Sequence, residues 1–465
     1  MTLNSLLGIA RSGLMVSQAQ IATTSQNVTN AQTPGYSRQR ARVSASYPQL
    51  MPQGVFGTGV QVDGIERLRN TLLDTTLRRD SQNASLAEER RDALQTIEGI
   101  FSEPSDTGLA SSLDQFWSAW SDLSTNPDSS AARSVVRQRG SQVAAQLNQF
   151  GNQINSAANG ARTQLSETAE RVNALAAQVA EINMRIVAAE ASGNEAPDMR
   201  DARDQRIDEL ASLVGATSLP QPNGSVNVNI GGDSLVDGAN YKTVRVQSLR
   251  NDPAKLGIAL GALPPGGSPT ETMYQLGGKV AGMLESYNQV YPGTLATLDG
   301  IASAIVTTVN SVHRTGFVGA TPAGDFYDAS RITARTIRLD TAIVSSAGNI
   351  AASGLANESG DNRVALAMSQ LRSTRVTVNG QNASIGEGYR SAIANIATTT
   401  NGANSTFEAA RTLLSQAEAR RESVKGVSID EEMVNLIKFQ QSYAAAARLV
   451  SVVDELSETL INLGR

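Results

Sequence analysis

The sequence predicts an elongated, mainly α-helical protein of several domains, with a β-rich insert near the middle of the chain. Apolar residues repeat at heptad spacing at both ends of the 465 residues, as in helices that pack along one another. Aromatic residues make up only 4% of the chain, and small side chains favour long packed helices over an aromatic-lined pocket. Residues 216–275 are rich in Gly, Pro, Asn and Val, which is typical of short strands joined by turns.

The composition excludes several classes of site. Cysteine is absent, which excludes disulfides and thiol nucleophiles, and the single histidine, His313, excludes a metal site built from several histidines. A net charge of −5 without a long basic run makes nucleic acid an unexpected partner. The sequence contains no run of 18 apolar residues, so we expect no membrane span. The N-terminus lacks the features of a cleaved signal peptide. We therefore expect no cofactor, no metal and no membrane partner.

The first expected element is a helix over residues 1–28. Its apolar and small residues alternate at four and three, the spacing of a seam that packs against another helix. Several of these positions are small or hydroxylated, so the seam is weak on its own. The seam positions are Leu3, Leu7, Ala10, Leu14, Ser17, Ile21, Thr24 and Val28.

A break follows this helix, with the sequence NVTNAQTPGYSRQR over residues 27–40. Within it, TPGY at 33–36 has the residue order of a type II turn, which predicts a positive φ at Gly35. Alternating side chains over 36–43 then predict a strand, with 59–63 as its return partner. The expected local structure is a helix, a turn and a hairpin.

Helices dominate the part of the chain before residue 215. One is expected over about 65–101 and another over 131–191. Interleaved acids and arginines over 198–210 indicate a charged helix surface. Between the first two helices lies the densest apolar face of the chain, which we interpret as core and not as a ligand site. That face consists of Leu109, Leu113, Phe116, Trp117, Trp120 and Leu123.

After the β-rich insert the helical pattern returns. Its last helix carries a second apolar stripe, and chains with a helical seam at each end usually bring the two ends together. The expected elements are helices at 278–291 and 294–313, a strand at 333–344, a turn at Asn379-Gly380, and a helix over 391–463 that breaks at Gly426. The C-terminal stripe contains Ile429, Met433, Leu436, Phe439, Tyr443, Ala446, Val450, Val453, Leu460 and Leu463.

Three patterns could carry chemistry, and each has a simpler explanation. No GxSxG elbow accompanies His313, so we expect this residue at a helix cap or on the surface. GGK at 277–279 lacks the other residues of a phosphate loop. The acids DEE at 430–432 would complement the dipole of a helix capped by Ser428, instead of binding a cation. We therefore predict no catalytic, cofactor or metal site, and a protein that is not an enzyme.

The two ends also carry sequence signatures of a known family. NVTNA at 27–31 and TPGYSRQ at 33–39 form one, and GVSIDEEMVNL at 426–436 with FQQSY at 439–443 forms the other. Two internal segments fall in the same order, GKVAGMLE at 278–285 and GDN at 360–362. In these signatures the chain resembles the axial proteins of the bacterial flagellum, the family of rod, hook and hook-associated proteins.

The resemblance implies a structural subunit that joins the flagellar hook to the filament. Such a subunit is expected outside the cell, exported by the flagellar type III apparatus without a cleaved signal. Its implied partners are other copies of itself in a ring-like or helical oligomer, the hook protein, the neighbouring filament-side hook-associated protein, and a flagellar export chaperone at the C-terminal helix. The implied assembly interface consists of Leu3, Leu7, Leu14, Ile21, Val28, Asn27, Asn30, Pro34, Gly35, Tyr36, Met433, Leu436, Phe439, Tyr443, Val450, Val453 and Leu460.

We expect three domains, each assembled from separate stretches of the chain. The terminal helices pair in an inner coiled-coil domain, a helical bundle forms the second domain, and a small β domain lies outermost. The ranges are 1–60 with 425–465 for the first, 61–215 with 278–316 and 361–424 for the second, and 216–275 with 317–350 for the third.

Other functions remain open. Another axial subunit, of hook or rod type, would usually show a Gly-Phe pair at the position of Pro34-Gly35-Tyr36. A secreted enzyme on a helical stalk would need clustered acids or a metal triad in the insert, where Asp233 and Asp237 are typical turn residues. A coiled-coil adhesin would need a long uninterrupted heptad or a membrane anchor.

Overall fold

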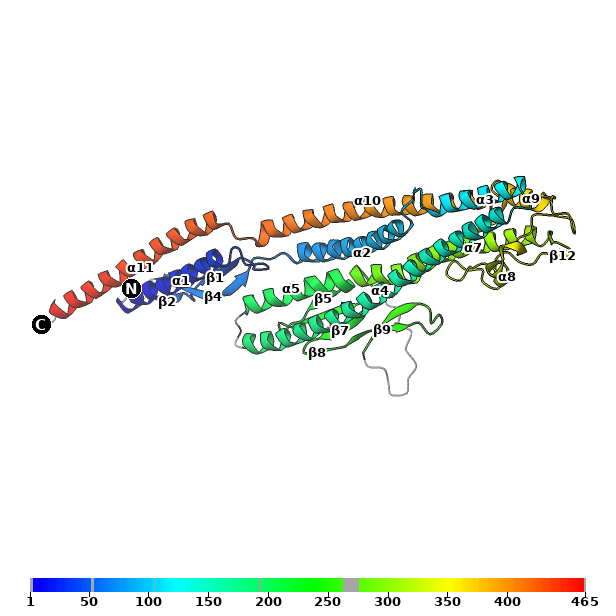
Figure 1. Cartoon of the computed structure of the whole chain (residues 1–465). Helices are drawn as coiled ribbons and strands as arrows, with labels where there is room; N and C mark the ends of the chain where they lie inside the picture. The colour runs from blue at the N-terminus through cyan, green and yellow to red at the C-terminus, as the bar shows by residue number, and fades with distance from the viewer. Residues whose placement is uncertain are drawn as a thin grey trace.

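The computed structural model describes residues 3–51, 54–103, 105–191, 193, 195–261 and 276–463. The molecule is elongated, and both chain termini lie at the same end of it (Figure 1). Long helices run along its length, and small β-sheets lie beside them. The expected mainly helical, elongated fold is confirmed.

The terminal helices pack along one another. α1 (Leu3–Thr29) and α11 (Ile429–Leu463) lie side by side at the end that holds both termini (Figure 1). The strands β1 (Gln39–Ala45) and β4 (Val60–Arg67) form an antiparallel hairpin against α1. We call α1, this hairpin and α11 the terminal domain. The hairpin is extended by β2 (Gln49–Met51) and β3 (Gly54–Phe56).

The predicted type II turn lies between α1 and the hairpin. The amide of Tyr36 donates to the carbonyl of Thr33 at 3.2 Å, and Gly35 has a φ of +82°. Glycine adopts this angle without steric cost, and a Cβ atom at Gly35 would also overlap the side chain of Gln205. The turn therefore brings the terminal domain into close contact with a helix of the bundle.

The larger hydrophobic core lies in the half of the molecule remote from the termini, and we call it the distal core. All six residues of the apolar face predicted as core are buried there, and Trp120 and Phe116 are completely inaccessible. The helices that line it are α2 (Thr71–Phe101), α3 (Leu109–Thr125), the first half of α4 (Ser130–Glu190), α7 (Tyr291–His313), α9 (Arg363–Gln370) and the start of α10 (Ile385–Lys425).

A second core joins the β-rich insert to three helices. The second half of α4, α5 (Pro197–Val214) and α6 (Gly278–Glu285) bury their apolar side chains against the strands. Four strands form an antiparallel sheet in the order β5-β6-β7-β8, and β9 pairs with β10. The strands are β5 (Thr217–Pro220), β6 (Val226–Ile230), β7 (Asp233–Asp237), β8 (Asn240–Tyr241), β9 (Val244–Ser248) and β10 (Leu256–Leu260).

Asparagines on the helices hold these strands by their backbone. Asn183 Nδ2 donates to the carbonyl of Val226 at 2.8 Å, and Asn183 Oδ1 accepts from the amide of Val226 at 3.1 Å. Asn173 and Asn288 form the same reciprocal pair with β9 and β10. Each asparagine takes the place of a neighbouring strand, which satisfies backbone groups that such short sheets leave unpaired.

The expected strand over residues 333–344 is wrong. The segment runs through turns into the short helix α8 (Thr341–Ser345), which the carboxylate of Asp340 caps. Ile337, Leu339 and Ile343 are buried in the distal core, so the alternation reflects the packing of an irregular segment. The remaining short elements are β11 (Phe317–Val318), β12 (Thr321–Pro322), the 3-10 helix Ala347–Asn349, β13 (Val376–Val378) and β14 (Gln381–Ala383), the last two joined by the predicted Asn379-Gly380 turn.

The helix expected from about residue 65 begins later. Ile65 belongs to β4, and the helix starts at Thr71, where the side chain of Asn70 accepts from the amides of Leu72 and Leu73. An asparagine cap satisfies amides that have no partner within the helix, and it fixes the start of the helix at this point.

The expected outer domain does not form as one unit. Residues 217–260 pack on α4, α5 and α6 in the second core, whereas residues 326–352 lie in the distal core with α3 and α7. The two segments therefore belong to different cores, because each covers the helix face that its own apolar residues contact. The rest of the insert, residues 262–275, lies outside the described residues.

Among the described residues, one helical stretch is long and apolar enough to cross a membrane by length and composition. It covers α6, the π-helical segment Ser286–Val290 and α7, that is Gly278–His313. Its apolar side chains are buried in both cores, Val280 and Met283 of α6 in the second core and residues of α7 such as Ile301 in the distal core. A core helix needs this composition, so the stretch by itself is weak support for a membrane span.

Candidate assembly surface and its joint with the bundle

The terminal helices meet through small side chains. Ala10, Ser17 and Thr24 of the predicted seam are buried in α1, and Ala446 and Val453 are buried in α11. Small residues let the two helices approach closely, because they occupy little space between the axes. The contact between α1 and α11 therefore leaves most of the large apolar side chains outside it.

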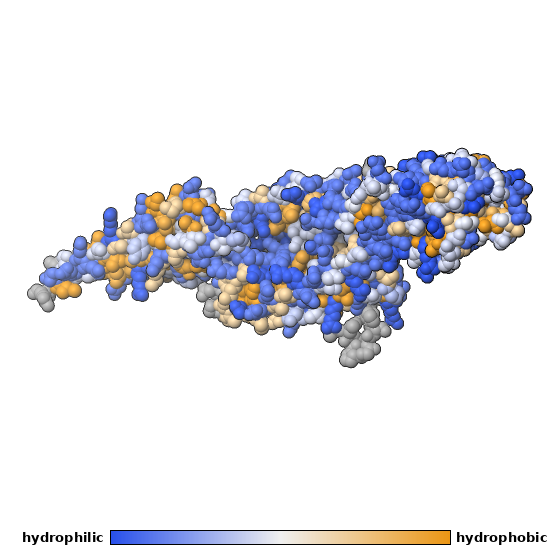
Figure 2. Space-filling model, viewed as in Figure 1, coloured by the Kyte–Doolittle hydropathy of each residue, from blue (hydrophilic) through white to orange (hydrophobic). Residues whose placement is uncertain are grey.

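Large apolar side chains are exposed along most of α11. Space-filling atoms of apolar residues gather over the terminal domain (Figure 2). Side chains such as Val434 and Leu460 are 66% and 56% exposed. We call the following set the α11 face: Ile429, Met433, Val434, Ile437, Tyr443, Leu449, Val452, Leu456, Leu460 and Ile461.

The predicted interface residues differ in exposure. Periodicity at heptad spacing finds one stripe of a helix, and it missed the residues of the α11 face that lie beside that stripe. Their signal was the presence of further apolar residues next to the stripe, such as Val434 beside Met433, or three positions from it, such as Leu456 after Val453. Of the predicted residues, Asn27 and Val453 are buried; Leu7, Pro34, Met433, Tyr443 and Leu460 are exposed; Leu3, Leu14, Ile21, Val28, Asn30, Gly35, Tyr36, Leu436, Phe439 and Val450 are half-buried.

Asn27 connects all three parts of the terminal domain. Its Nδ2 donates to the carbonyl of Gln39 and to Oε2 of Glu432, and its Oδ1 accepts from the amide of Gln39 and the hydroxyl of Tyr36, each at 2.9 Å. The side chain is 1% exposed. The side-chain amide thus makes four hydrogen bonds, two as donor and two as acceptor. These bonds fix the break, β1 and α11 relative to α1.

The acids at the start of α11 bind a specific partner. Arg38 donates to Glu432 and to Glu431, each at 2.8 Å, and its amide donates to the carbonyl of Lys425 at 2.9 Å. Glu432 is 2% exposed. The explanation by the helix dipole alone was therefore incomplete, because these carboxylates tie α11 to the strand that follows the break. Burial and the nearby carboxylates of Asp198, Asp201 and Glu432 raise the pKa of Tyr36.

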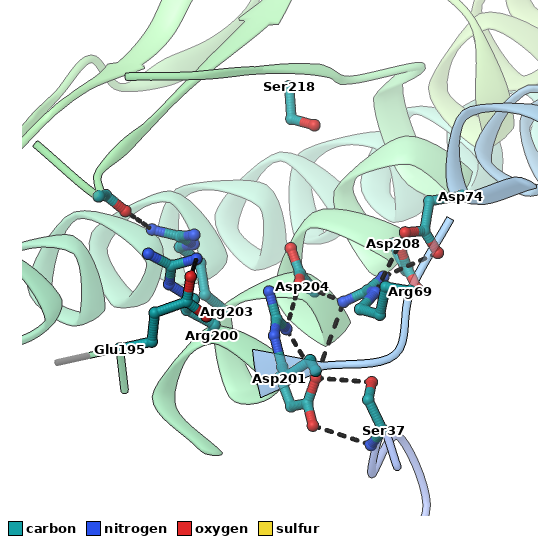
Figure 3. Close-up of polar contacts among 12 residues, drawn as sticks. Ser37, Arg69, Asp74, Glu195, Arg200, Asp201, Arg203, Asp204, Asp208 and Ser218 are labelled. Carbon is teal, nitrogen blue, oxygen red and sulfur yellow. Dashed lines mark hydrogen bonds and ion pairs between the residues drawn. The ribbon is translucent and has the colours of Figure 1, made fainter. Parts of the chain in front are cut away.

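A row of aspartates on α5 joins the terminal domain to the bundle (Figure 3). Asp198 accepts from Gln39 Nε2 at 2.8 Å, and Asp201 accepts from the hydroxyl and the amide of Ser37 at 2.8 Å. The expectation of a charged helix surface over 198–210 is wrong, since Asp201 is only 5% exposed. Sequence alone could not place the partners, which lie more than 130 residues away along the chain.

Arginines from four places converge on the same row. Arg67 Nη1 lies 2.7 Å from Asp201 and 2.8 Å from Asp204. Arg69 pairs with Asp204 and, at 2.7 Å, with Asp74. The last aspartate of the row, Asp208, accepts from Arg78 at 2.7 Å and from Arg421 at 2.5 Å.

Electrostatics at this joint are balanced. Burial by itself would raise the pKa of Asp204, but the charges of Arg69, Arg67 and Arg78 hold it below its ordinary value. Arg203, on the side of α5 that faces the insert, donates to Asn183 Oδ1 at 2.9 Å and is 4% exposed; its burial lowers its pKa to about 10. The arginines around Asp204 therefore favour the ionised form of this carboxyl group.

His313 is buried and is neither a cap nor a surface residue. Its Nδ1 lies 2.7 Å from the carbonyl of Gly324, and its Nε2 accepts from the amide of Ala351 at 3.1 Å. The expectation was wrong because the segment after α7 folds back over the end of the helix. In the described part of the chain, no three side chains of His, Asp or Glu are grouped so that they could hold a metal ion.

Comparisons with known proteins agree with this architecture. The family model for the Flagellar hook-associated protein FlgK helical domain matches residues 94–327, and that for the Flagellar basal body rod FlgEFG protein C-terminal matches residues 423–463. The second match falls on α11 and the link before it, which is where the exposed apolar face lies.

Relatives match over nearly the whole chain. The flagellar hook-associated protein 1 of Bacillus subtilis (strain 168) is 30% identical, with 98% of this chain and 97% of the relative covered. That of Escherichia coli (strain K12) is 24% identical, with 99% and 100% covered. The solved structure of the flagellar hook junction protein FlgK from Burkholderia pseudomallei has the same fold, with a TM-score of 0.65, 15% identity, and 75% of this chain and 100% of that chain covered. The chain therefore belongs to the flagellar hook-associated protein 1 family, whose members are structural proteins of the bacterial flagellum.

Proposed function

We propose that this chain is a structural subunit that joins the flagellar hook to the filament and assembles through its terminal helices. The observation that supports it is the α11 face, an apolar surface without a partner inside the described chain. Contiguous apolar patches on soluble proteins usually mark interaction sites. Each half-exposed Leu or Ile of this face would gain about 1 kcal/mol on full burial, so several together would contribute a large part of an assembly contact.

The proposed interface combines the predicted residues with the α11 face. This interface would belong to an inner domain of residues 1–60 and 425–465, and α1 would contribute Leu7, Leu14 and Ile21 to it. Neighbouring copies in a ring-like or helical oligomer, the hook protein and the filament-side hook-associated protein would cover this surface in the flagellum. Before assembly, a flagellar export chaperone would cover α11 during passage through the type III apparatus. The subunit would act outside the cell, without a cleaved signal and without a catalytic role.

A double substitution on the α11 face tests the proposal. Ile437→Asp with Val452→Asp places two carboxylates on the face, and Gln441→Asp is the control, because Gln441 is an exposed polar residue of the same helix. We expect the double variant to be exported but to leave cells with hooks and no filaments, with flagellin in the medium. The control should swim normally.

Two outcomes would argue against the assignment. Normal filaments and motility in cells that produce only the double variant would show that the α11 face is not an assembly surface. Loss of the hook itself in cells without this chain would favour the alternative of a hook or rod subunit.

A further inference from the structure

The contact between the terminal domain and the bundle is built from polar groups. Among the described residues, neither hydrophobic core includes a residue of α1, the hairpin or α11. Only two stretches of backbone cross between the two bodies, residues 68–70 and 426–428. Apolar burial therefore contributes little to their relative orientation, which depends on hydrogen bonds and ion pairs.

These polar contacts fall on one face of α5. The first three aspartates of the row are spaced by three residues, so successive carboxylates are about 4.5 Å apart along the helix axis. From the terminal domain, Gln39 contacts Asp198, and Ser37 contacts Asp201. Arg67 contacts both Asp201 and Asp204. The terminal domain thus contacts a series of equivalent carboxylates along one helix.

Each arginine at the joint has more than one partner. Arg67 is shared between Asp201 and Asp204, and Arg69 lies within ion-pair distance of Asp74, Asp201 and Asp204. A buried charge that loses its only partner is strongly destabilising. With two or three partners within reach, an arginine can exchange one carboxylate for the next and keep an ion pair throughout.

The joint also has open space beside it. A cavity of about 390 Å³ lies between the break and α5. One wall is formed by the break and the other by α5, with three basic side chains beside them. The lining residues are Pro34, Gly35, Ser37, Asp201, Asp204, Gln205, Asp208, Arg69, Arg421 and Lys425. A close-packed apolar interface would resist small shifts. This interface, with a cavity and exchangeable partners, offers a path for them.

We infer that the joint is a stepped hinge, in which Asp201 and Asp204 act as positioning residues that set how the terminal domain is held on the bundle. A change of partner from one aspartate to the next shifts the terminal domain along α5 by three residues of the helix, about 4.5 Å. The hinge stands on the geometry alone. Its use, to let subunits meet differently placed neighbours on the two sides of a junction, rests on the proposed function.

Spin labelling of the full-length chain tests the hinge. The chain has no cysteine, so Ser25→Cys on α1 and Ser405→Cys on α10, both at exposed sites, give one defined label pair. Pulsed electron paramagnetic resonance then measures the distance between the bodies. We expect Asp204→Asn to move the main distance by about 5 Å or to change the ratio of two populations at least tenfold.

Asp208→Asn is the matched control. It removes the same charge from the same row, but Asp208 pairs with Arg78 and Arg421, which both belong to bundle helices. We expect its distance distribution to equal that of the parent chain. Should Asp204→Asn fail to fold, as judged by circular dichroism, Arg67→Gln removes the ion pairs that Arg67 forms with Asp201 and Asp204, and it carries the same expectation.

Three results would overturn the inference. Unchanged distances in both Asp204→Asn and Arg67→Gln would show a rigid joint. An equal change in Asp208→Asn would show a general effect of charge. One broad distribution in the parent chain would show that the joint holds no defined positions. These distances are measured on the isolated chain, whereas the proposed assembly is tested by motility. A failure of the hinge prediction can therefore be distinguished from a failure of the proposed function.

Discussion

His313 makes the stability of the distal core dependent on pH. The imidazole is completely inaccessible, and its ring lies 5.7 Å from that of Phe326 and 6.4 Å from that of Trp120. Nε2 accepts from the amide of Ala351, so a proton on Nε2 would face another N–H group. Burial lowers the pKa of His313, while the hydrogen bond to Gly324 and the charges of Asp325 and Asp340 oppose this effect only in part.

The sign of the pH dependence follows from this lowered pKa. In the unfolded chain the imidazole takes up a proton near its ordinary pKa of 6.5, whereas the folded imidazole stays neutral to lower pH. Below about pH 6.5 the unfolded state binds more protons, so the free energy of unfolding falls as the pH is lowered. Each unit by which the pKa is lowered contributes about 1.4 kcal/mol to this loss.

Tryptophan fluorescence measures the effect where it occurs. The chain contains two tryptophans, Trp117 and Trp120, and both lie in the distal core. Denaturant unfolding at pH 7.5, 6.5 and 5.5 should give a midpoint that decreases at the lower values. In His313→Gln the midpoint should be lower throughout, because the two backbone partners cannot both be matched and an unpaired buried group costs about 1–3 kcal/mol.

The two chains should differ in slope as well. His313→Gln carries no group that titrates near neutral pH, so its midpoint should change little between pH 7.5 and 5.5. The same pH dependence in both chains would refute the reasoning. The imidazole resonances provide a second readout, since the chain has a single histidine.

Three further predictions address the break, the insert and the terminal domain. Gly35→Val should cost about 1–3 kcal/mol of local strain, because Gly35 has a φ of +82° and no space for a Cβ atom. Motility should fall while the unfolding midpoint measured by tryptophan fluorescence is unchanged, and wild-type swimming would contradict this. Asn183→Ala should destabilise the insert by about 3–5 kcal/mol, because three backbone groups and Arg203 each lose a hydrogen bond to Asn183. Limited proteolysis within β6–β8 should become faster, with exposed Asn152→Ala as the control. Asn27→Ala should accelerate amide exchange in α1 at least a hundredfold, because four buried hydrogen bonds are lost and 1.4 kcal/mol corresponds to a factor of ten in exchange. Equal exchange rates in Asn27→Ala and in the control Ser25→Ala would show that the contacts of Asn27 do not stabilise α1.

Local features were predictable where short segments determine their own geometry. The spacing of apolar residues predicted the long helices α1, α4 and α11, and the Pro-Gly order predicted the positive φ of Gly35. Asn379-Gly380 predicted the turn between β13 and β14. These features depend on backbone sterics and on periodicity, which neighbouring residues in the sequence supply.

A helical seam at each end of the chain was also present in the sequence. It predicted that the two ends pair, and the structure has α1 beside α11. Which apolar residues remain exposed was not predictable, because one helix can bury any stripe that its partner covers. In the structure small residues such as Ala10 and Ala446 are buried, whereas larger apolar residues of α11 remain exposed.

The sequence by itself thus determined the helices, the turn, the pairing of the ends and the resemblance to flagellar axial proteins. Only the tertiary structure decided that His313 is buried, that the acids of α5 form a joint, and that residues 217–260 and 326–352 belong to different cores. The physical reason is the separation along the chain of the residues that interact. Sterics and periodicity act between residues a few positions apart, whereas the burial and pairing of a charge depend on groups such as Arg67 and Asp201, which meet only when the chain is folded.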